Sequence, residues 1–342
     1  MALWNRKSVS ICIPTFNQSG YLMEAIESIL NQTAAANEII VSDDASTDET
    51  ERIMAGIVSK YPNVRYIRQP INLGIAGNTN AALRLAQGEF VVRLDSDDRL
   101  LPDYVSILSR ELAIHENAGY AHADVWEIDG AGNRLNRRTL ARARGFQTAD
   151  DALVAALKGY RVTANVIMFR RQALEALNYT ANRPNYVEDY SLSVAMAREG
   201  WGNIYVDKDL AEYRVWLDKK GFRAKRKAME LKGIIRTFEE EINPGFSERG
   251  WDFSEIQKAR RRQAIVHALA LTNSGLSRAE NDELGDLLRK LGASAALELQ
   301  IFLIRLGLGL LVRAGFGGIA AMKRLVKNAA RLSRSGIGGM SQ

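Results

Sequence analysis

Short apolar runs alternate with amphipathic stretches through the first hundred residues, and this alternation constrains the fold more than any other feature. The apolar runs predict four strands, at Val9–Pro14, Glu38–Ser42, Val64–Arg68 and Phe90–Leu94. Three helices are expected between these strands. The first spans Tyr21–Gln32, the second begins at a capping box of Ser46 and Glu49 and ends at Lys60, and the third spans Ile75–Gln87. Strands that alternate with helices through short connections predict an α/β fold. Its mostly parallel, Rossmann-like central sheet is covered by helices on both faces.

The rest of the chain falls into two parts. Beyond Pro102 the pattern predicts two further helices, at 103–116 and Val187–Glu199, and a turn at Asp129–Asn133. Strands are expected near Val125, Val166, Ile204 and Tyr213. After Trp216 the pattern is entirely helical. We therefore expect an α/β catalytic domain over residues 1–218 and an α-helical C-terminal region with a basic amphipathic tail over residues 219–342.

Polar clusters follow three of the predicted strands. "PTFN" (14–17) follows the first strand, "SDDAS" (42–46) the second, and "DSDD" (95–98) the fourth. Because all strands of a parallel sheet end at the same edge, and ligands bind in the crevice outside that edge, these clusters are expected to meet there. An isolated acidic turn would be explained by solvent alone, whereas three such clusters at one edge indicate a binding site.

Carboxylates at such an edge point to a hard cation. Mg²⁺ and Mn²⁺ prefer oxygen ligands and commonly bridge one or two carboxylates to substrate phosphates. "PTFNQSG" is not a glycine-rich phosphate loop, so a metal is the main means of neutralising a diphosphate. Asp43 and Asp44 are suited to a nucleobase N–H or a ribose hydroxyl. Arg93 is suited either to the diphosphate or to a neighbouring carboxylate.

The motifs also resemble a known family. "PTFN", "SDDASTDET", "NLGIAGNTNAAL", "LDSDD" and "VEDYSL", in this order and spacing, resemble the family 2 glycosyltransferases, which have the GT-A fold. The resemblance covers roughly residues 8–216. It implies an inverting enzyme that moves a sugar from a nucleoside-diphosphate sugar, most simply a UDP-sugar, to a hydroxyl of a glycan or lipid-linked glycan. The setting it implies is cell-surface polysaccharide biosynthesis.

The resemblance also implies roles for individual residues. Asp189 would be the catalytic base with Glu188 in support, and Asp97 and Asp95 of the D-x-D motif would hold Mn²⁺ or Mg²⁺. The residues expected to bind the nucleotide sugar are Pro14, Thr15, Phe16, Asn17, Asp43, Asp44, Asn72, Gly74, Asn80, Arg93, Asp95 and Ser96. A simpler interpretation of Glu188 and Asp189 is that they complement the dipole at a helix N-terminus.

One departure from the family pattern bears on the metal. Many members have Tyr-Arg-x-His after the last core strand, and the His can reach the metal, but here "EYRVW" has Trp216 at that position. Either the metal is held by Asp97, the diphosphate and water, or Trp216 stacks on a sugar ring. Two alternative functions stay open: a nucleotide-sugar hydrolase or other phosphoryl-transfer enzyme, and a non-catalytic nucleotide-sugar-binding partner.

Charge and cysteine content narrow the setting. The net charge is +6, but residues Leu299–Gln342 contain seven Lys and Arg and no Asp or Glu, so the remainder is close to neutral and a nucleic-acid groove is not expected. The single Cys12 and the absence of a signal-peptide pattern favour the cytoplasm. Leu297–Leu311 is apolar but short and charged for a membrane span, and 319–334 is amphipathic with one basic face. This tail either contacts the cytoplasmic face of a membrane, packs on the protein, or forms a homo-oligomer.

Overall fold

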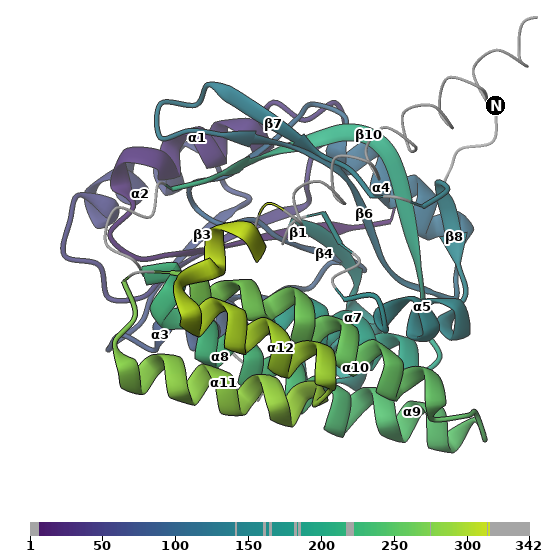
Figure 1. Ribbon diagram of the computed structural model, residues 1–342. Coiled ribbons are helices and arrows are strands. Elements are labelled where there is room, and N and C mark those ends of the chain that lie inside the picture. Colours follow the sequence, from purple (N-terminus) through teal and green to yellow (C-terminus); the bar gives the residue numbers. More distant parts are fainter. Residues whose placement is uncertain are drawn as a thin grey trace, which may run out of the picture. The chain divides into compact units, whose positions relative to one another are not determined.

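The computed structural model describes residues 7–140, 142–159, 162–163, 166–180, 183, 186–216, 222–273, 275–312 and 314. Within them the strands form one sheet in the order β3-β2-β1-β4-β9-β6-β10-β5, with β7 paired to β6 and β8 to β10 (Figure 1). The strands are β1 (Val9–Thr15), β2 (Glu38–Asp43), β3 (Val64–Arg68), β4 (Phe90–Arg93), β5 (Arg99–Leu100), β6 (Ala118–Ile128), β7 (Arg134–Arg138), β8 (Gly145–Gln147), β9 (Ile167–Arg170) and β10 (Gly202–Arg214).

The strand directions follow the prediction for the first half of the sheet. β1 pairs in parallel with β2 and β4, and β2 pairs in parallel with β3. β9 lies antiparallel between β4 and β6, while β10 is parallel to β6. The two strands expected near Ile204 and Tyr213 are a single strand, β10, whose register along β6 shifts at irregularities between Val206 and Ala211. The exposed charges in the middle of β10 mark this irregular region, which the sequence pattern had split in two.

Helices cover both faces of the sheet because alternate strand residues point to opposite faces. Val9, Ile11 and Ile13 join one buried cluster with α1, α2 and α4, whereas Cys12 joins another with α3, α6 and α7. Figure 1 shows α1 and α2 on one side of the sheet and α3 and α7 on the other. The helices of this part are α1 (Ser19–Leu30), α2 (Thr50–Lys60), α3 (Gly74–Arg84), α4 (Tyr104–Ile114), α5 (Ala149–Ala156), α6 (Arg171–Ala176) and α7 (Glu188–Arg198).

The N-terminus of α2 differs from the expected capping box. Helix α2 begins at Thr50, and its N-cap residue Glu49 makes no side-chain capping bond. Asp48 performs this function instead, because its Oδ1 accepts hydrogen bonds from the backbone N (3.1 Å) and hydroxyl (2.6 Å) of Thr50. The hydroxyl of Ser46 is engaged elsewhere, with the backbone N–H of Asn17. The predicted Ser46–Glu49 capping box is therefore wrong.

The chain divides into two compact units. The first comprises Met1–Asp218 with Arg236–Phe253, and the second comprises Lys219–Ile235 with Ser254–Gln342. The segment 236–253 was expected in the helical region but joins the first unit, where Arg183 Nη1 pairs with Glu241 Oε1 at 2.5 Å and Arg198 Nε lies 3.0 Å from Glu248 Oε1. Ion pairs between positions 50 or more residues apart cannot be read from local sequence patterns.

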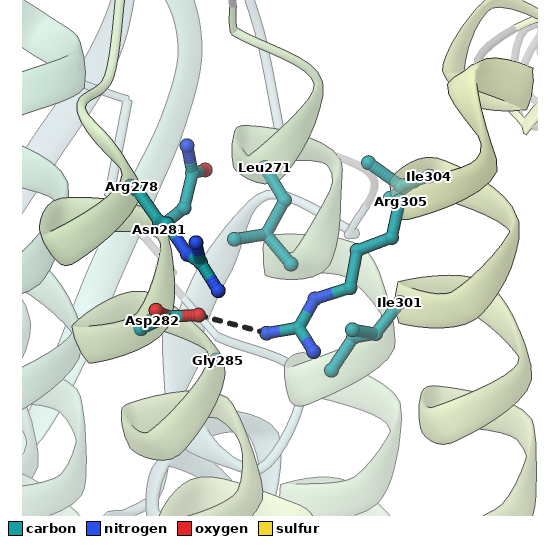
Figure 2. A pocket seen from close by; sticks show the side chains of 8 residues that line it. All are labelled: Leu271, Arg278, Asn281, Asp282, Gly285, Ile301, Ile304 and Arg305. Carbon is teal, nitrogen blue, oxygen red and sulfur yellow. Dashed lines mark hydrogen bonds and ion pairs between the residues drawn. The ribbon is translucent and has the colours of Figure 1, made fainter.

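The remaining helical elements are α8 (Phe222–Thr237), a π-helical turn (Phe238–Ile242), α9 (Asn243–Glu248), α10 (Ser254–His267), a 3₁₀ turn (Ala268–Thr272), α11 (Arg278–Gly292), α12 (Ala295–Leu303) and a π-helical turn (Ile304–Leu308). A cavity of about 540 Å³ opens in the second unit, and none of the predicted site residues lines it. Figure 2 shows its lining and the ion pair, 2.9 Å long, between Arg305 Nη2 and Asp282 Oδ1. The lining residues are Leu271, Arg278, Asn281, Asp282, Gly285, Ile301, Ile304 and Arg305.

One helical stretch within the described residues, Ala295–Val312, is long and apolar enough to cross a membrane, with a mean hydropathy of 1.9. The stretch is not straight, because Gly307 adopts φ +81°, a left-handed conformation that interrupts a helix. Most of its apolar side chains are exposed in this chain, including Leu299, Phe302 and Leu306. The predicted amphipathic helix over 319–334 lies outside the described residues.

Candidate functional site

The ends of β1 and β2 form one hydrogen-bonded unit. The backbone N–H of Asn17 donates to Ser46 Oγ (2.9 Å), and Asn17 Oδ1 accepts from the backbone N–H of Thr47 (2.8 Å). Asn17 and Ala45 adopt φ of 52° and 60°, which is uncommon for residues other than glycine. Such strained conformations concentrate at functional sites. The structure thus brings together the "PTFN" and "SDDAS" clusters, as expected for neighbouring parallel strands.

Asp43 has a structural environment. Its buried carboxylate accepts hydrogen bonds from the Tyr66 hydroxyl (2.6 Å) and the Ser46 backbone N–H (3.0 Å), and Arg68 Nε lies 3.6 Å away. These partners come from β3 and from the turn after β2. A carboxylate engaged on both oxygens has little capacity left for a ligand, so these contacts favour a role in fixing the turn.

Asp44 connects this turn to the loop before α3. Its Oδ1 accepts a hydrogen bond from the Leu73 backbone N–H at 2.7 Å. In that loop Asn72 Oδ1 accepts from the backbone N–H of Gly74 (3.0 Å), and Gly74 has φ +74°, which only glycine adopts without strain. Asn72 and Gly74 therefore shape the loop that Asp44 holds.

Asn78 is a site residue that the sequence analysis missed. It is buried; its Oδ1 accepts from Ser42 Oγ (2.6 Å) and its Nδ2 donates to Ser42 O (2.8 Å) and Thr15 O (3.4 Å), so it ties α3 to the ends of β1 and β2. The expected Asn80 instead accepts from the Thr180 backbone N–H (3.2 Å). The sequence does contain a signal for Asn78, because it lies one helical turn before the apolar Ala82 and therefore on the buried face of α3.

The remaining nucleotide-binding candidates at the strand ends differ in exposure. Pro14, Thr15 and Ser96 are buried, whereas the Phe16 side chain is 46% exposed. Phe16 therefore offers an apolar ring at the surface directly after β1, whereas the other three side chains are enclosed by the protein.

Arg93 connects the D-x-D motif to the Glu188–Asp189 pair. Its buried guanidinium donates from Nε to Asp95 Oδ1 (2.9 Å), and its Nη1 lies 3.8 Å from Glu188 Oε2. The pairing of Arg93 with a neighbouring carboxylate, one of its two expected roles, is present as the contact with Asp95. The last residue of β4 thus holds together two motifs that are more than 90 residues apart in sequence.

Glu188 and Asp189 open α7 at this edge and have perturbed acidities. The pKa of Glu188 is raised to about 7, mainly by burial; the nearby Asp189 and Asp95 charges contribute to the increase and Arg93 opposes it. Burial likewise raises the pKa of Asp189, against the lowering effect of Arg93. Glu188 Oε1 is buried and has no hydrogen-bond partner among the described residues. A carboxylate whose pKa is shifted toward neutrality is suited to accept a proton from a substrate.

Asp97 and Asp98 are fixed by the end of β10. Trp216 Nε1 donates to Asp97 Oδ2 (2.8 Å), and Arg214 Nε donates to the backbone carbonyl of Asp97 (2.8 Å). Asp98 is buried and accepts from the backbone N–H of Arg214 (2.7 Å). Burial raises the pKa of Asp97 and Asp98, and the neighbouring Asp95 charge raises both further.

Asp95 and Asp97 fit a divalent cation that would take most of its other ligands from substrate phosphate and from water. Carboxylate oxygens of Asp95 and Asp97 suit Mg²⁺ or Mn²⁺, and their mutual repulsion in a partly buried turn would be relieved by a cation. The described residues contain no group of three or more His, Cys, Asp or Glu side chains arranged to hold a metal. The donor set therefore matches a metal completed by phosphate and water.

Comparison with known proteins agrees with this geometry. Residues 10–177 match the family model for glycosyl transferase family 2. A 115-residue region, 33% of this chain, is 41% identical to the GalNAc(5)-diNAcBac-PP-undecaprenol beta-1,3-glucosyltransferase of Campylobacter jejuni. This match spans 36% of that protein, and matches to three other curated relatives span 18% or less of theirs.

Two solved structures share the fold. The mannosyltransferase PcManGT from Pyrobaculum calidifontis, in complex with GDP-Man and Mn²⁺, is 19% identical with a TM-score of 0.56, covering 96% of this chain and 87% of that one. TarS from S. aureus, in complex with UDP-GlcNAc, is 17% identical with a TM-score of 0.53, covering 82% and 90%. The fold is the GT-A fold expected from the motifs, followed by helices. Through residues 10–177 this chain belongs to the family 2 glycosyl transferases.

Proposed function

We propose that this chain is an inverting, metal-dependent glycosyltransferase that uses a nucleoside-diphosphate sugar, with UDP-sugars as the first candidates. The observation that carries the proposal is the Arg93 contact to both Asp95 and Glu188, which joins the D-x-D turn to an acidic pair of raised pKa. The structural relatives hold UDP-GlcNAc and GDP-Man, which supports a nucleotide-sugar donor.

The proposed reaction is a single displacement. Asp189 accepts the proton of the acceptor hydroxyl, whose oxygen forms a bond to the anomeric carbon from the face opposite the diphosphate. The bond from that carbon to the diphosphate oxygen breaks, and the configuration inverts. Asp189 is partly buried next to Glu188, and the charge of the Arg93 guanidinium opposes the effect of burial on its pKa. A bound Mn²⁺ or Mg²⁺ at Asp97 and Asp95 would supply positive charge to the leaving diphosphate.

The acceptor is proposed to be a glycan or lipid-linked glycan in cell-surface polysaccharide biosynthesis. The Campylobacter relative is named for an undecaprenol-linked substrate, which supports a lipid-linked acceptor. The donor side is tested by transfer assays with UDP-, dTDP- and GDP-sugars in Mn²⁺ or Mg²⁺. Product that forms only when acceptor is present supports a transferase. Release of sugar at the same rate without acceptor would favour the hydrolase alternative, and donor binding without any turnover would favour the non-catalytic one.

We also propose that the protein works at the cytoplasmic face of a membrane, as a peripheral protein. Leu299, Phe302 and Leu306 are each more than half exposed at helical spacing, and the sequence from Leu299 onward is basic without acids. The interruption at Gly307 favours a helix lying in the membrane interface over a straight membrane-spanning helix.

Full-length protein carrying Phe302→Glu and Leu306→Glu should lose flotation with anionic liposomes. The polar double variant Glu280→Gln and Glu283→Gln on α11 is the control. Equal flotation of both variants would contradict the proposal, and concentration-dependent self-association would favour the homo-oligomer.

A further inference from the structure

Trp216 is brought to the D-x-D turn by strand geometry. Arg214 ends β10, and the backbone continues in register because the Val215 N–H donates to the Ile128 carbonyl at 2.9 Å. Side chains two positions apart in an extended strand point to the same face. Arg214 and Trp216 therefore reach the same turn, and both bond to Asp97.

The two contacts hold Asp97 at both ends. Arg214 Nε fixes the backbone carbonyl at 2.8 Å, and Trp216 Nε1 fixes the side-chain oxygen Oδ2 at 2.8 Å. The hydrogen bond from Arg214 thus fixes the position of the Asp97 backbone, and the hydrogen bond from Trp216 fixes the orientation of its carboxylate. Because Oδ2 accepts the indole N–H, Oδ1 is the oxygen better suited to bind a cation.

The indole ring is itself held in place. The Tyr21 ring meets it edge-on, with centroids 5.3 Å apart and planes at 74°, and the Arg214 guanidinium lies 4.6 Å from the Tyr21 centroid. At Gly130 a Cβ atom would lie 3.4 Å from the indole ring, in van der Waals contact. The ring is nevertheless 46% exposed, so its replacement removes little buried surface.

The chemistry of this arrangement differs from that of a metal-ligating residue. An indole N–H is a hydrogen-bond donor only and cannot bind a metal, whereas imidazole is a common metal ligand. Hydrogen bonds to a ligating carboxylate typically influence metal affinity by ten- to a hundred-fold. The site therefore has a carboxylate that is oriented by Trp216 but lacks a third strong side-chain ligand among the described residues.

We propose that Trp216 is a positioning residue that orients Asp97 and makes metal capture depend on the nucleoside diphosphate. This inference rests on the proposed function and adds an order of binding to it. With Asp97 oriented but no third strong side-chain ligand among the described residues, the site would hold a metal weakly unless diphosphate oxygens supplied the remaining ligands. Trp216 touches no reacting atom in this account, and it acts through Asp97.

The test measures Mn²⁺ binding by the loss of the free-ion electron paramagnetic resonance signal, with and without UDP, on the full chain. Wild-type protein should bind Mn²⁺ at least tenfold more tightly with UDP than without it. Trp216→Phe should lower the affinity for Mn²⁺ in the presence of UDP by roughly ten- to a hundred-fold. Trp216→His should raise the affinity for Mn²⁺ alone by tenfold or more. Trp251→Phe, at a ring that contacts Phe246 and Arg249, should match wild type.

A purely structural role for Trp216 makes different predictions. In that case Trp216→Phe would weaken UDP binding in EDTA as much as in Mn²⁺, and Trp216→His would not bind Mn²⁺ alone. Either result would overturn the inference while leaving the proposed function standing. Wild-type protein that fails to bind UDP under any condition would overturn both.

Discussion

Replacing Arg214 tests how the D-x-D turn is built. The side chain is fully buried, and besides Asp97 it donates to the carbonyls of Asp129 (2.8 Å) and Gly130 (3.0 Å) and to Glu24 Oε2 (2.9 Å). Hydrogen bonds from a charged donor contribute about 1.5–3 kcal/mol each, and carbonyls left buried without a partner add a desolvation cost. The Glu24 side chain is 43% exposed, so that ion pair contributes at most about 1 kcal/mol. The carbonyl contacts therefore dominate.

Arg214→Met keeps the length of the stem and removes the donors. We expect it to lower the free energy of unfolding by about 3–5 kcal/mol, the range for breaking a buried charged interaction. For a unit of this size that corresponds to a decrease in Tm of roughly 6–20 °C, measured by circular dichroism. Glu24→Gln is the matched control and should cost about 1 kcal/mol or less, because Arg214 retains its three carbonyls. If both variants lose the same stability, the ion pair rather than the carbonyl network holds the turn, and the reasoning is wrong.

The other predictions concern the acidic pair and the sheet edge. Asp189→Asn should lower kcat by about 10²–10⁴-fold while UDP affinity stays within twofold by calorimetry, and near-normal transfer would exclude Asp189 as the base. Because the pKa of Glu188 is raised to about 7, mainly by burial, Glu188 becomes protonated near neutrality and the acidic pair loses negative charge, so kcat/KM should fall as the pH decreases from 8 to 6; an acid limb that appears only below pH 5 would contradict this. Asn78→Ala removes the acceptor of the Ser42 hydroxyl and a donor to the Ser42 carbonyl, and it should cost about 2–3 kcal/mol in chemical denaturation, whereas Asn80→Ala, at a half-buried position, should cost less than about 1 kcal/mol.

Local patterns were sufficient for the parallel half of the sheet. Each of the first four strands has a short apolar run bounded by polar residues, and their observed bounds differ from the expected ones by no more than one residue. Since parallel strands end at one edge, the proximity of "PTFN" and "SDDAS" followed from topology without any knowledge of contacts. The D-x-D turn was placed at the same edge by the same argument.

Contacts between distant segments could not be predicted in this way. The contact of Arg93 with Asp95 is local, but its second contact depends on α7, which lies more than 90 residues away and brings Glu188 within 3.8 Å. Asn78 and Asn80 are both polar residues of one motif; helical spacing marks Asn78 as buried, but its bonds to the strand ends follow from the packing of α3. The Trp216 contact likewise depends on the register with which β10 pairs to β6.

The charge balance at the sheet edge explains why these long-range contacts matter. Five carboxylates gather around two buried guanidiniums, those of Arg93 and Arg214; the carboxylates belong to Asp95, Asp97, Asp98, Glu188 and Asp189. Burial and mutual repulsion raise the pKa of four of them, which means that the folded chain holds these negative charges at a cost. Arg93 offsets that cost on the side of Glu188 and Asp189, whereas on the side of Asp97 the Arg214 guanidinium is directed to backbone carbonyls and Glu24. The Asp97 carboxylate therefore receives a hydrogen bond from Trp216, while Arg214 bonds only to its backbone carbonyl, and a divalent cation and a diphosphate would together complete the site there.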